Sequence, residues 1–390
     1  MKLACSQNRL PDINRTADSV RKPGSRPRAQ TGQQTLRETR AADAACKPGP
    51  AAGSPEHGSP KHGRPVEQNR LRQNMKGTGV NMKIVVIEPL GVEQEKFMQI
   101  ARAAVGEKAE IICYDTRTTD PDELGRRGHD ADIIAIGNLP FPREVLEKCG
   151  NLKMLAVAFT GLDHVDMNYC AERGIKVQNC AGYATTAVAE LTFGLLLNLY
   201  RNISKCDEAA RASGTKDGLI GFELEGKTMG IVGTGAIGSR TAKLAAAFGM
   251  NVIAYSRTPG RVAGIPYVSL DELLQKADVV SLHVPLTDET RGMIGKEQIA
   301  LMKKSAVLVN TARGPVVDTA ALADALNSGR IAGAAIDVFD KEPPLDADEP
   351  LINARNTVVT PHVAFATKES MIKRAEIEFR NIADFIKAQA

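Results

Sequence analysis

Short, continuous runs of apolar residues alternate with amphipathic stretches between residue 82 and residue 390. Each run has the length of a strand but lacks the polar alternation of a half-exposed one, which is typical of parallel strands covered by helices on both faces. We therefore expect an α/β chain of two doubly wound parallel-sheet units. The expected strands cover 83–90, 110–116, 132–137, 152–159 and 175–179 in the first unit, and 228–233, 251–256, 278–285, 306–311, 332–339 and 356–361 in the second.

Two long helices are expected outside this regular alternation. Residues 185–201 form an apolar helix between the units, which continues in some form to about residue 212. Residues 367–390 form an amphipathic helix beyond the last strand of the second unit, and we expect it to return to the first unit. No stretch reaches the roughly 18 apolar residues of a membrane span, so we expect no membrane partner.

The first 81 residues have a different composition from the rest of the chain. They contain eight proline, eight glycine and no aromatic residues, and their few apolar residues follow no period. Such a segment cannot bury enough apolar surface to offset its ordering entropy, so we expect disorder. A basic arm for nucleic acid and an organelle transit peptide are alternatives, and Met75 or Met82 is a possible true start.

The net charge bears on whether the protein binds nucleic acid, and the cysteine pattern bears on its cellular compartment. Residues 1–81 carry a net charge of +9 and residues 82–390 a net charge of −5, so the body gives no reason to expect a nucleic-acid partner. The seven cysteines include no C-x-x-C pair, which indicates neither a disulfide framework nor a metal site. A reducing, cytoplasmic location fits this pattern.

A glycine-rich turn follows the first strand of the second unit. Gly233, Gly235 and Gly238 form G-x-G-x-x-G between that strand and the expected helix 236–248. The glycines allow a tight turn, the approach of a phosphate and close helix packing, and the helix N-terminus faces the pyrophosphate. In this context the turn predicts a dinucleotide site, to which Ala236 and Ile237 also contribute, whereas alone it would be weak evidence.

The end of the next strand bears on the choice of cofactor. Sites for NAD usually place an acid there, but here Ser256 and Arg257 stand in its place, and Arg261 is near in the sequence. A hydroxyl and a guanidinium suit a 2′-phosphate, so we expect NADP to be favoured over NAD. In the alternative interpretation, Arg257 is a solvated surface residue and NAD binds.

Three polar residues follow strands of the second unit and could carry chemistry. Arg313, Glu342 and His362 should meet at the carboxyl edge of the sheet, where ligands of such sheets bind. A guanidinium can anchor the carboxylate of a 2-oxo acid, and a histidine can protonate its ketone as hydride arrives. A glutamate beside the histidine would orient it and stabilise its charged form. Each residue alone could be structural, and only their joint placement behind a cofactor turn supports catalysis.

Several motifs over residues 82–390 resemble the D-isomer-specific 2-hydroxyacid dehydrogenase family, which uses NAD(P). They are "IVGTGAIGSRTAKLAAAFGMNVIAY", "LHVPLTDETRGMIG", "LVNTARGPVVD", "AAIDVFDKEPP" and "VVTPHVAFAT". The resemblance implies Arg313 as anchor, Glu342 as partner and His362 as acid and base. It implies that Asp337 lies near the nicotinamide, and that the cofactor is lined by His283, Val284, Pro285, Thr311 and Ala312 as well as by Arg313 and His362.

The resemblance also implies an organisation for the chain. It predicts a discontinuous flavodoxin-like substrate domain (82–183 and 363–390) and a Rossmann dinucleotide-binding domain (184–362), after the extension 1–81. In "VAFTGLDHVD" the residues Phe159, Thr160 and Gly161 would meet the substrate carboxylate, and "AGYATTAVAELTFGLLL" would build a homodimer. The activity implied is reduction of a small 2-oxo acid such as glyoxylate, hydroxypyruvate or pyruvate. A dinucleotide-sensing binding protein on the same fold is the alternative.

Overall fold

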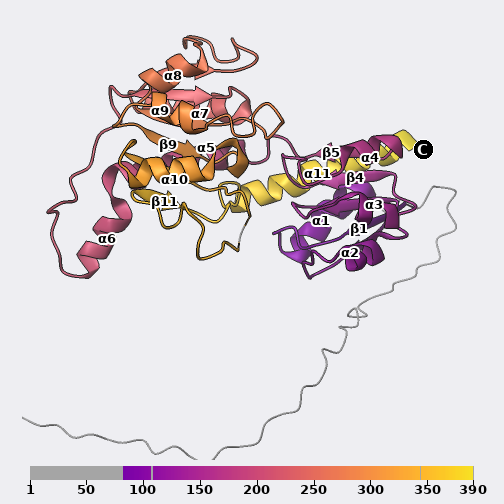
Figure 1. The fold of residues 1–390 in the computed structure, drawn as a ribbon. Coiled ribbons are helices and arrows are strands. Elements are labelled where there is room, and N and C mark those ends of the chain that lie inside the picture. Colours follow the sequence, from indigo (N-terminus) through magenta and orange to yellow (C-terminus); the bar gives the residue numbers. More distant parts are fainter. Residues whose placement is uncertain (1–81, 107–108, 343, 390) are drawn as a thin grey trace, which may run out of the picture. The chain divides into compact units, whose positions relative to one another are not determined.

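The structure is a computed structural model that describes residues 82–106, 109–342 and 344–389. The predicted disorder of residues 1–81 therefore lies outside the described residues. The described chain forms two parallel sheets with helices on both faces, as the sequence predicts (Figure 1). None of the described helices is both long enough and apolar enough to cross a membrane.

The first sheet has five strands in the order β2-β1-β3-β4-β5, and all neighbours are parallel. Alternate residues of β1 point to opposite faces: Ile84 packs with α1 and α11, whereas Val85 packs with α2 and α3. This division explains the continuous apolar runs, because both faces are buried. The elements are β1 (Met82–Val86), α1 (Gln94–Val105), β2 (Ala109–Cys113), α2 (Pro121–Gly128), β3 (Ile133–Ile136), α3 (Arg143–Lys148), β4 (Met154–Val157), α4 (Met167–Glu172) and β5 (Lys176–Asn179).

The second sheet has six strands in the order β11-β10-β9-β8-β6-β7, again all parallel. Helices α5 and α7 cover one face, and α8, α9 and α10 cover the other. The elements are α5 (Thr185–Arg201), α6 (Ile203–Arg211), β6 (Thr228–Val232), α7 (Ala236–Ala247), β7 (Asn251–Tyr255), α8 (Leu270–Lys276), β8 (Val279–Leu282), α9 (Lys296–Leu301), β9 (Val307–Asn310), the 3-10 turn η2 (Gly314–Val316), α10 (Thr319–Asn327), β10 (Gly333–Ile336) and β11 (Thr357–Val359).

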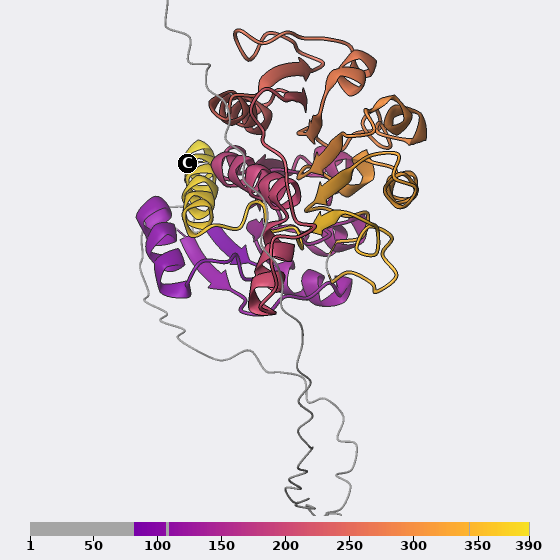
Figure 2. The same cartoon turned by 90° about the vertical axis from the view of Figure 1, so that its left-hand side faces the viewer.

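The last helix, α11 (Lys368–Gln389), packs on the first sheet. Figure 2 shows it in yellow beside α1 in indigo, and the rings of Phe97 and Phe379 meet edge-on with centroids 5.2 Å apart. Phe379 is fully buried, and burial of such a side chain contributes about 1.5–3 kcal/mol to folding. The predicted return of this helix is therefore seen, while the domain limits at residues 183 and 363 stay predictions.

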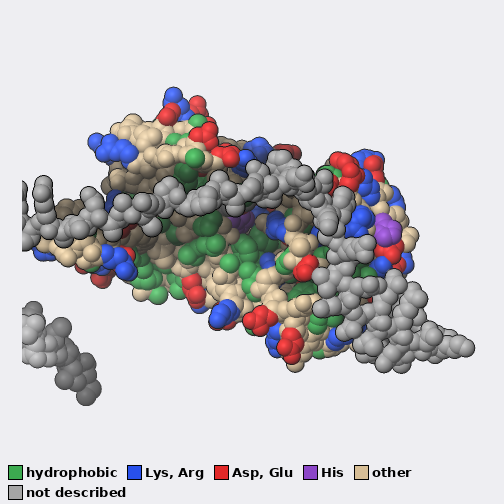
Figure 3. All heavy atoms as spheres, turned by 90° about the horizontal axis from the view of Figure 1, so that it is seen from below, with side chains coloured by type: hydrophobic (Ala, Val, Ile, Leu, Met, Phe, Trp, Pro, Cys, Tyr) green, Lys and Arg blue, Asp and Glu red, His purple; other side chains and the backbone are tan. Residues whose placement is uncertain are grey.

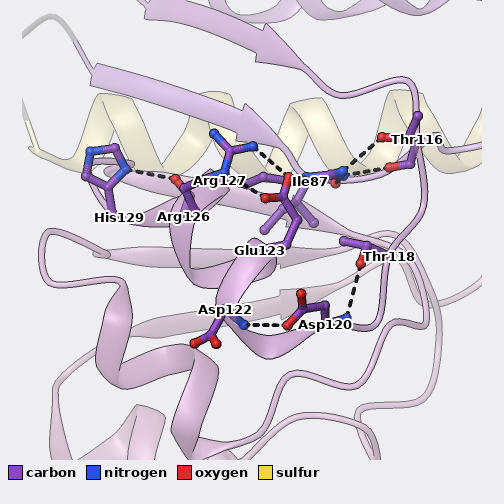
Figure 4. A network of polar contacts seen from close by, with 9 residues as sticks. All are labelled: Ile87, Thr116, Thr118, Asp120, Asp122, Glu123, Arg126, Arg127 and His129. Atoms are coloured by element: carbon purple, nitrogen blue, oxygen red, sulfur yellow. Dashed lines mark hydrogen bonds and ion pairs between the residues drawn. The ribbon is translucent and has the colours of Figure 1, made fainter. Parts of the chain in front are cut away.

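A buried arginine joins the loops at the carboxyl ends of β1 and β2 (Figure 4). Asp120 caps α2 by accepting a 3.0 Å hydrogen bond from the backbone N–H of Asp122, and the helix then carries Arg127 inward. Its guanidinium donates to the carbonyls of Ile87 at 2.8 Å and Thr116 at 2.6 Å. The charge of Arg127 is balanced by an ion pair with Glu123 at 2.9 Å. This network fixes the carboxyl edge of the first sheet without exposing unpaired backbone groups.

Candidate active site

The glycine-rich turn between β6 and α7 has the geometry that its sequence predicts. Gly233 has a φ of +96°, which favours glycine, and a Cβ there would lie 2.7 Å from the carbonyl oxygen of His283. A Cβ at Gly238 would overlap the carbonyl oxygen of Gly233. Gly233 is therefore required by the packing of the turn against the segment after β8, and Gly238 by the packing of α7 against the turn.

Gly235 is different, because the protein itself does not require a glycine there. A Cβ at this position would meet no protein atom within 4 Å, and the backbone is extended. Gly235 caps α7, whose first N–H groups, including those of Ala236 and Ile237, receive no side-chain cap. Open space next to free N–H groups at the positive end of a twelve-residue helix fits a pyrophosphate.

The residues that the sequence predicts to select the cofactor lie just after β7, where solvent reaches them. Ser256 is half-buried and Arg257 is exposed, and Arg257 forms no ion pair with any residue in the described ranges. Tyr267, which the sequence did not single out, donates a 3.2 Å hydrogen bond to Thr234 Oγ1 inside the glycine-rich turn. Its hydroxyl also accepts the N–H of Val262 at 3.1 Å, which ties the following loop to that turn.

The segments after β8 and β9 reach the same edge, because every strand of this sheet runs parallel. His283, followed by Val284 and Pro285, lies 2.9 Å from Ser281 Oγ, and burial lowers the pKa of His283 to about 3, so its ring is neutral. Asn310 shapes the next turn: its Oδ1 accepts the N–H of Ala312 at 3.0 Å and its Nδ2 donates to the carbonyl of Arg313 at 2.9 Å. The neighbouring Thr311 is buried, within 3.1 Å of Thr192 Oγ1 on α5.

His362 and Glu342 form a direct pair. Nδ1 of His362 lies 2.5 Å from Oε2 of Glu342, although the two residues come from the loops after different strands. His362 has a φ of +55°, and such a left-handed conformation at a residue other than glycine costs about 1–3 kcal/mol. Strain of this kind persists where surrounding bonds enforce it, which is frequent at functional sites.

Asp337 supplies those bonds. Its carboxylate is fully buried and accepts hydrogen bonds from Thr360 Oγ1 at 2.5 Å and from the N–H groups of Val363 and Ala364 at 2.9 Å each. Burial raises the pKa of Asp337, and these hydrogen bonds oppose that rise. The carboxylate thus brackets His362 from both sides, a positioning role that the sequence did not suggest. A contact between Asp337 and the nicotinamide stays a prediction.

A single aromatic ring connects the histidine with the arginine. The centroid of Phe159 lies 5.8 Å from the His362 ring and 5.8 Å from the guanidinium carbon of Arg313. Phe159 lies two residues after β4 of the first sheet. Arg313 and His362 follow strands of the second sheet. Thr160 and Gly161 follow it, exposed and half-buried respectively. The structure therefore brings Phe159, Arg313, Glu342 and His362 into one cluster.

Comparison with known proteins agrees with this geometry. Residues 193–364 match the family model described as D-isomer specific 2-hydroxyacid dehydrogenase, NAD binding domain. A hydroxypyruvate reductase from Blautia hydrogenotrophica is 39% identical over 319 residues, which covers 78% of this chain and 97% of that protein. The chain belongs to the D-isomer-specific 2-hydroxyacid dehydrogenase family. As a member, this dehydrogenase is an oxidoreductase with a Rossmann-type NAD-binding domain.

Solved structures similar to this dehydrogenase hold both forms of the nucleotide. An acyclic imino acid reductase in complex with NADPH and D-Arg superimposes with a TM-score of 0.72 at 32% identity, covering 79% of this chain and 98% of that one. D-Lactate dehydrogenase from Aquifex aeolicus, in complex with NAD and lactic acid, gives a TM-score of 0.68 at 32% identity, covering 78% and 96%. Likeness to these proteins therefore leaves the preference between the two cofactors open.

One residue of this dehydrogenase's site was missed by sequence reasoning although it stands in a quoted motif. Asp163 accepts a hydrogen bond from Nε of Arg313 at 3.2 Å. The only signal in the sequence was an acid two residues after Gly161, and nothing there indicates a partner 150 residues away. Gly161 has no left-handed φ, yet a Cβ on it would overlap Nη2 of Arg313. The glycine is therefore needed to admit the guanidinium.

Proposed function

We propose that the protein is an NAD(P)H-dependent reductase of small 2-oxo acids, such as hydroxypyruvate, glyoxylate or pyruvate, which yields the D-2-hydroxy acid. The observation that carries this proposal is the meeting of a guanidinium and a carboxylate-paired imidazole on the ring of Phe159. Family membership supports chemistry on a CH–OH group, and the cluster supplies the two groups that a 2-oxo acid needs.

Each polar residue has a distinct part in this proposal. Arg313 holds the substrate carboxylate and polarises the ketone, because a planar guanidinium matches both oxygens. The glycine-rich turn would hold the pyrophosphate of a reduced dinucleotide, whose nicotinamide would supply the hydride for carbon 2. His362 gives a proton to the ketone oxygen, so one hydride and one proton convert C=O to CH–OH. Glu342, at 2.5 Å from Nδ1, holds the ring so that Nε2 is free for the substrate.

The spectrophotometric test uses the full chain with NADPH or NADH and a panel of hydroxypyruvate, glyoxylate, pyruvate and 2-oxoisocaproate. We expect loss of nicotinamide absorbance with at least one of these acids. Tight nucleotide binding without turnover of any acid would favour the alternative proposal, a dinucleotide-sensing protein. The intact pairing of Glu342 with His362 disfavours that alternative, because a sensor has no use for an oriented proton donor.

We propose that NADPH is the preferred cofactor. Exposed Arg257 and half-buried Ser256 follow β7, where the 2′ position of a bound adenosine ribose would lie. Arg257 forms no ion pair among the described residues, so its guanidinium is available to a 2′-phosphate.

Replacement of Arg257 by Asp should reverse this preference. The variant removes the phosphate partner and adds a carboxylate that accepts hydrogen bonds from a ribose 2′-OH and repels a phosphate. We expect the ratio of kcat/KM for NADPH to that for NADH to fall by about 100-fold, since loss of an ion pair and gain of a repulsion each contribute. Arg240→Asp, on an exposed face of α7, is the control. An unchanged ratio for Arg257→Asp would contradict the phosphate pocket.

We also propose that the protein is a homodimer. Helix α6 buries none of its residues against the described chain, and Ile220 and Phe222 beyond it are 83% and 66% exposed. Hydrophobic side chains gather on one face of the coloured part of the molecule (Figure 3). Apolar surface of this kind usually marks an interface. Sedimentation equilibrium should give twice the 41.8 kDa of one chain.

A cytoplasmic location stays a prediction from the cysteine pattern.

A further inference from the structure

The anchor residue Arg313 already has a carboxylate partner within the chain. Its Nε donates to Oδ1 of Asp163 at 3.2 Å, and this ion pair links the loop after β4 with the loop after β9. The side chains are 19% and 37% exposed, so the pair lies at the edge of the site rather than in the core. A partly exposed pair of this kind contributes only modestly to stability. A structural reason alone therefore does not account for an acid at this position.

The remaining contacts of Arg313 show which of its guanidinium N–H groups already have a partner within the chain. Nη1 donates to the carbonyl of Ala312 at 2.8 Å, so one N–H of that nitrogen is engaged with the local backbone. Nη2 lies against Gly161, where a Cβ would overlap it and would come within 2.6 Å of Asp163 Oδ1. The loop Gly161–Asp163 is thus shaped around the guanidinium: a glycine makes room for Nη2 and an aspartate binds Nε.

Asp163 is the residue that balances the positive charge of Arg313. His164, the next residue, is half-buried, and burial lowers its pKa to about 4, with Arg313 lowering it further and Asp163 opposing. The imidazole of His164 is therefore neutral at neutral pH and brings no charge to the pair. Among the described residues, Asp163 is the one acidic side chain that forms an ion pair with Arg313.

We propose that Asp163 is a positioning residue for the substrate anchor. By binding the Nε edge, it fixes the rotation of the guanidinium, so that the free N–H groups of Nη1 and Nη2 are presented to the substrate carboxylate before the substrate arrives. A guanidinium that is oriented in advance loses less conformational entropy on binding. The proposal rests on the proposed function, because it assumes that Arg313 holds the carboxylate of a 2-oxo acid.

The test is a double-mutant cycle on the full chain, with hydroxypyruvate and NADPH as substrates. Asp163→Ala should raise the KM for hydroxypyruvate about tenfold and leave the KM for NADPH unchanged, because only the acid anchor loses its orientation. Asp163→Asn keeps an oxygen at the same place and should restore the KM to within about threefold. Asp324→Ala, an exposed aspartate of α10 that makes no hydrogen bond or ion pair through its side chain with the described residues, is the control and should match the parent.

The second half of the cycle separates this proposal from a general loss of structure. In an Arg313→Ala background, Asp163→Ala should change kcat/KM by less than about twofold, since a residue that acts through Arg313 has nothing left to position. Equal losses in both backgrounds, or a lower KM in Asp163→Ala, would overturn the proposal, the latter because it would make Asp163 a competitor of the substrate. If Arg313→Ala alone keeps the parent kcat/KM, the role of Arg313 in the proposed function fails as well.

Discussion

Replacement of His362 by Asn should lower kcat for reduction of a 2-oxo acid by a factor on the order of 10² to 10⁴, the range that a general acid contributes. In the proposed function, the imidazole is the side chain of the cluster that gives a proton to the ketone oxygen. Asn suits this position better than Ala, because His362 occupies the left-handed region and asparagine tolerates it. The hydrogen bonds from the N–H groups of Val363 and Ala364 to the Asp337 carboxylate should therefore persist in the variant.

Cofactor binding is the internal control for this variant. The affinity for NADPH, measured by fluorescence titration, should stay within about threefold of the parent, since the glycine-rich turn at Gly233 and Gly235 carries the pyrophosphate. His129→Asn is the matched control, because that ring is 66% exposed at the C-terminal end of α2 and its polar contacts within the described ranges are those with the Arg126 carbonyl and Asp130. A His362→Asn enzyme that turns over at the parent rate would remove His362 from the mechanism.

Replacement of Glu378 by Gln should stabilise the fold at alkaline pH. Glu378 lies on α11 against the first sheet, is 1% exposed, and neither of its carboxylate oxygens has a hydrogen-bond partner in the described chain. Burial raises the pKa of Glu378 to about 8; Arg374 on the same helix opposes that rise and Glu88 reinforces it. The side chain is thus largely neutral at pH 7, and above pH 8 the fold must hold an unpaired buried charge.

The sign of the pH dependence follows from this raised pKa. In the unfolded chain the carboxyl ionises near its ordinary value of 4.5, so the folded state binds the extra proton between pH 4.5 and about 8. The contribution of Glu378 to stability is present below pH 4.5 and is lost as the pH rises through about 8. The half-buried thiol of Cys113 beside it has a pKa raised to about 11 by burial, so it does not titrate in this range.

Chemical denaturation at pH 5, 7 and 9 measures the effect. The gain in the free energy of unfolding for Glu378→Gln over the parent should be small at pH 5 and reach on the order of 5 kcal/mol at pH 9, because each unit of pKa shift is worth about 1.4 kcal/mol. Glu376→Gln, on the exposed face of the same helix, should show no such trend. Parallel stability curves for the parent and Glu378→Gln would show that the carboxyl titrates normally.

The fold was predictable because its helices and strands satisfy local rules. Pro121–Gly128 and Thr185–Arg201 begin and end where the sequence predicts, since a proline starts the first and helical apolar spacing delimits the second. The expected strand 332–339 is too long, because the ladder ends at Ile336 and the chain then turns to bury Asp337. An apolar run does not reveal where hydrogen bonding to its neighbours stops.

The candidate site was predictable only where parallel strands bring residues together. Arg313, Glu342 and His362 each follow a strand of one parallel sheet, so topology alone predicts that they share an edge. The pairing of Asp163 with Arg313 depends on how a loop of the other sheet approaches, and no local spacing encodes that. The left-handed backbone of His362 is equally hidden, because histidine has no glycine-like preference for it.

The position of α11 has a consequence for synthesis of the chain. The strands of the first sheet leave the ribosome before the second sheet is made, but α11, which covers one of their faces together with α1, follows the second sheet in the chain. The segment 185–359 contains a complete sheet of its own, so it can reach its final packing before α11 covers the first sheet. Nascent chains of this protein therefore carry an incompletely covered apolar surface while the second sheet is made, and α11 covers the rest of that surface only afterwards.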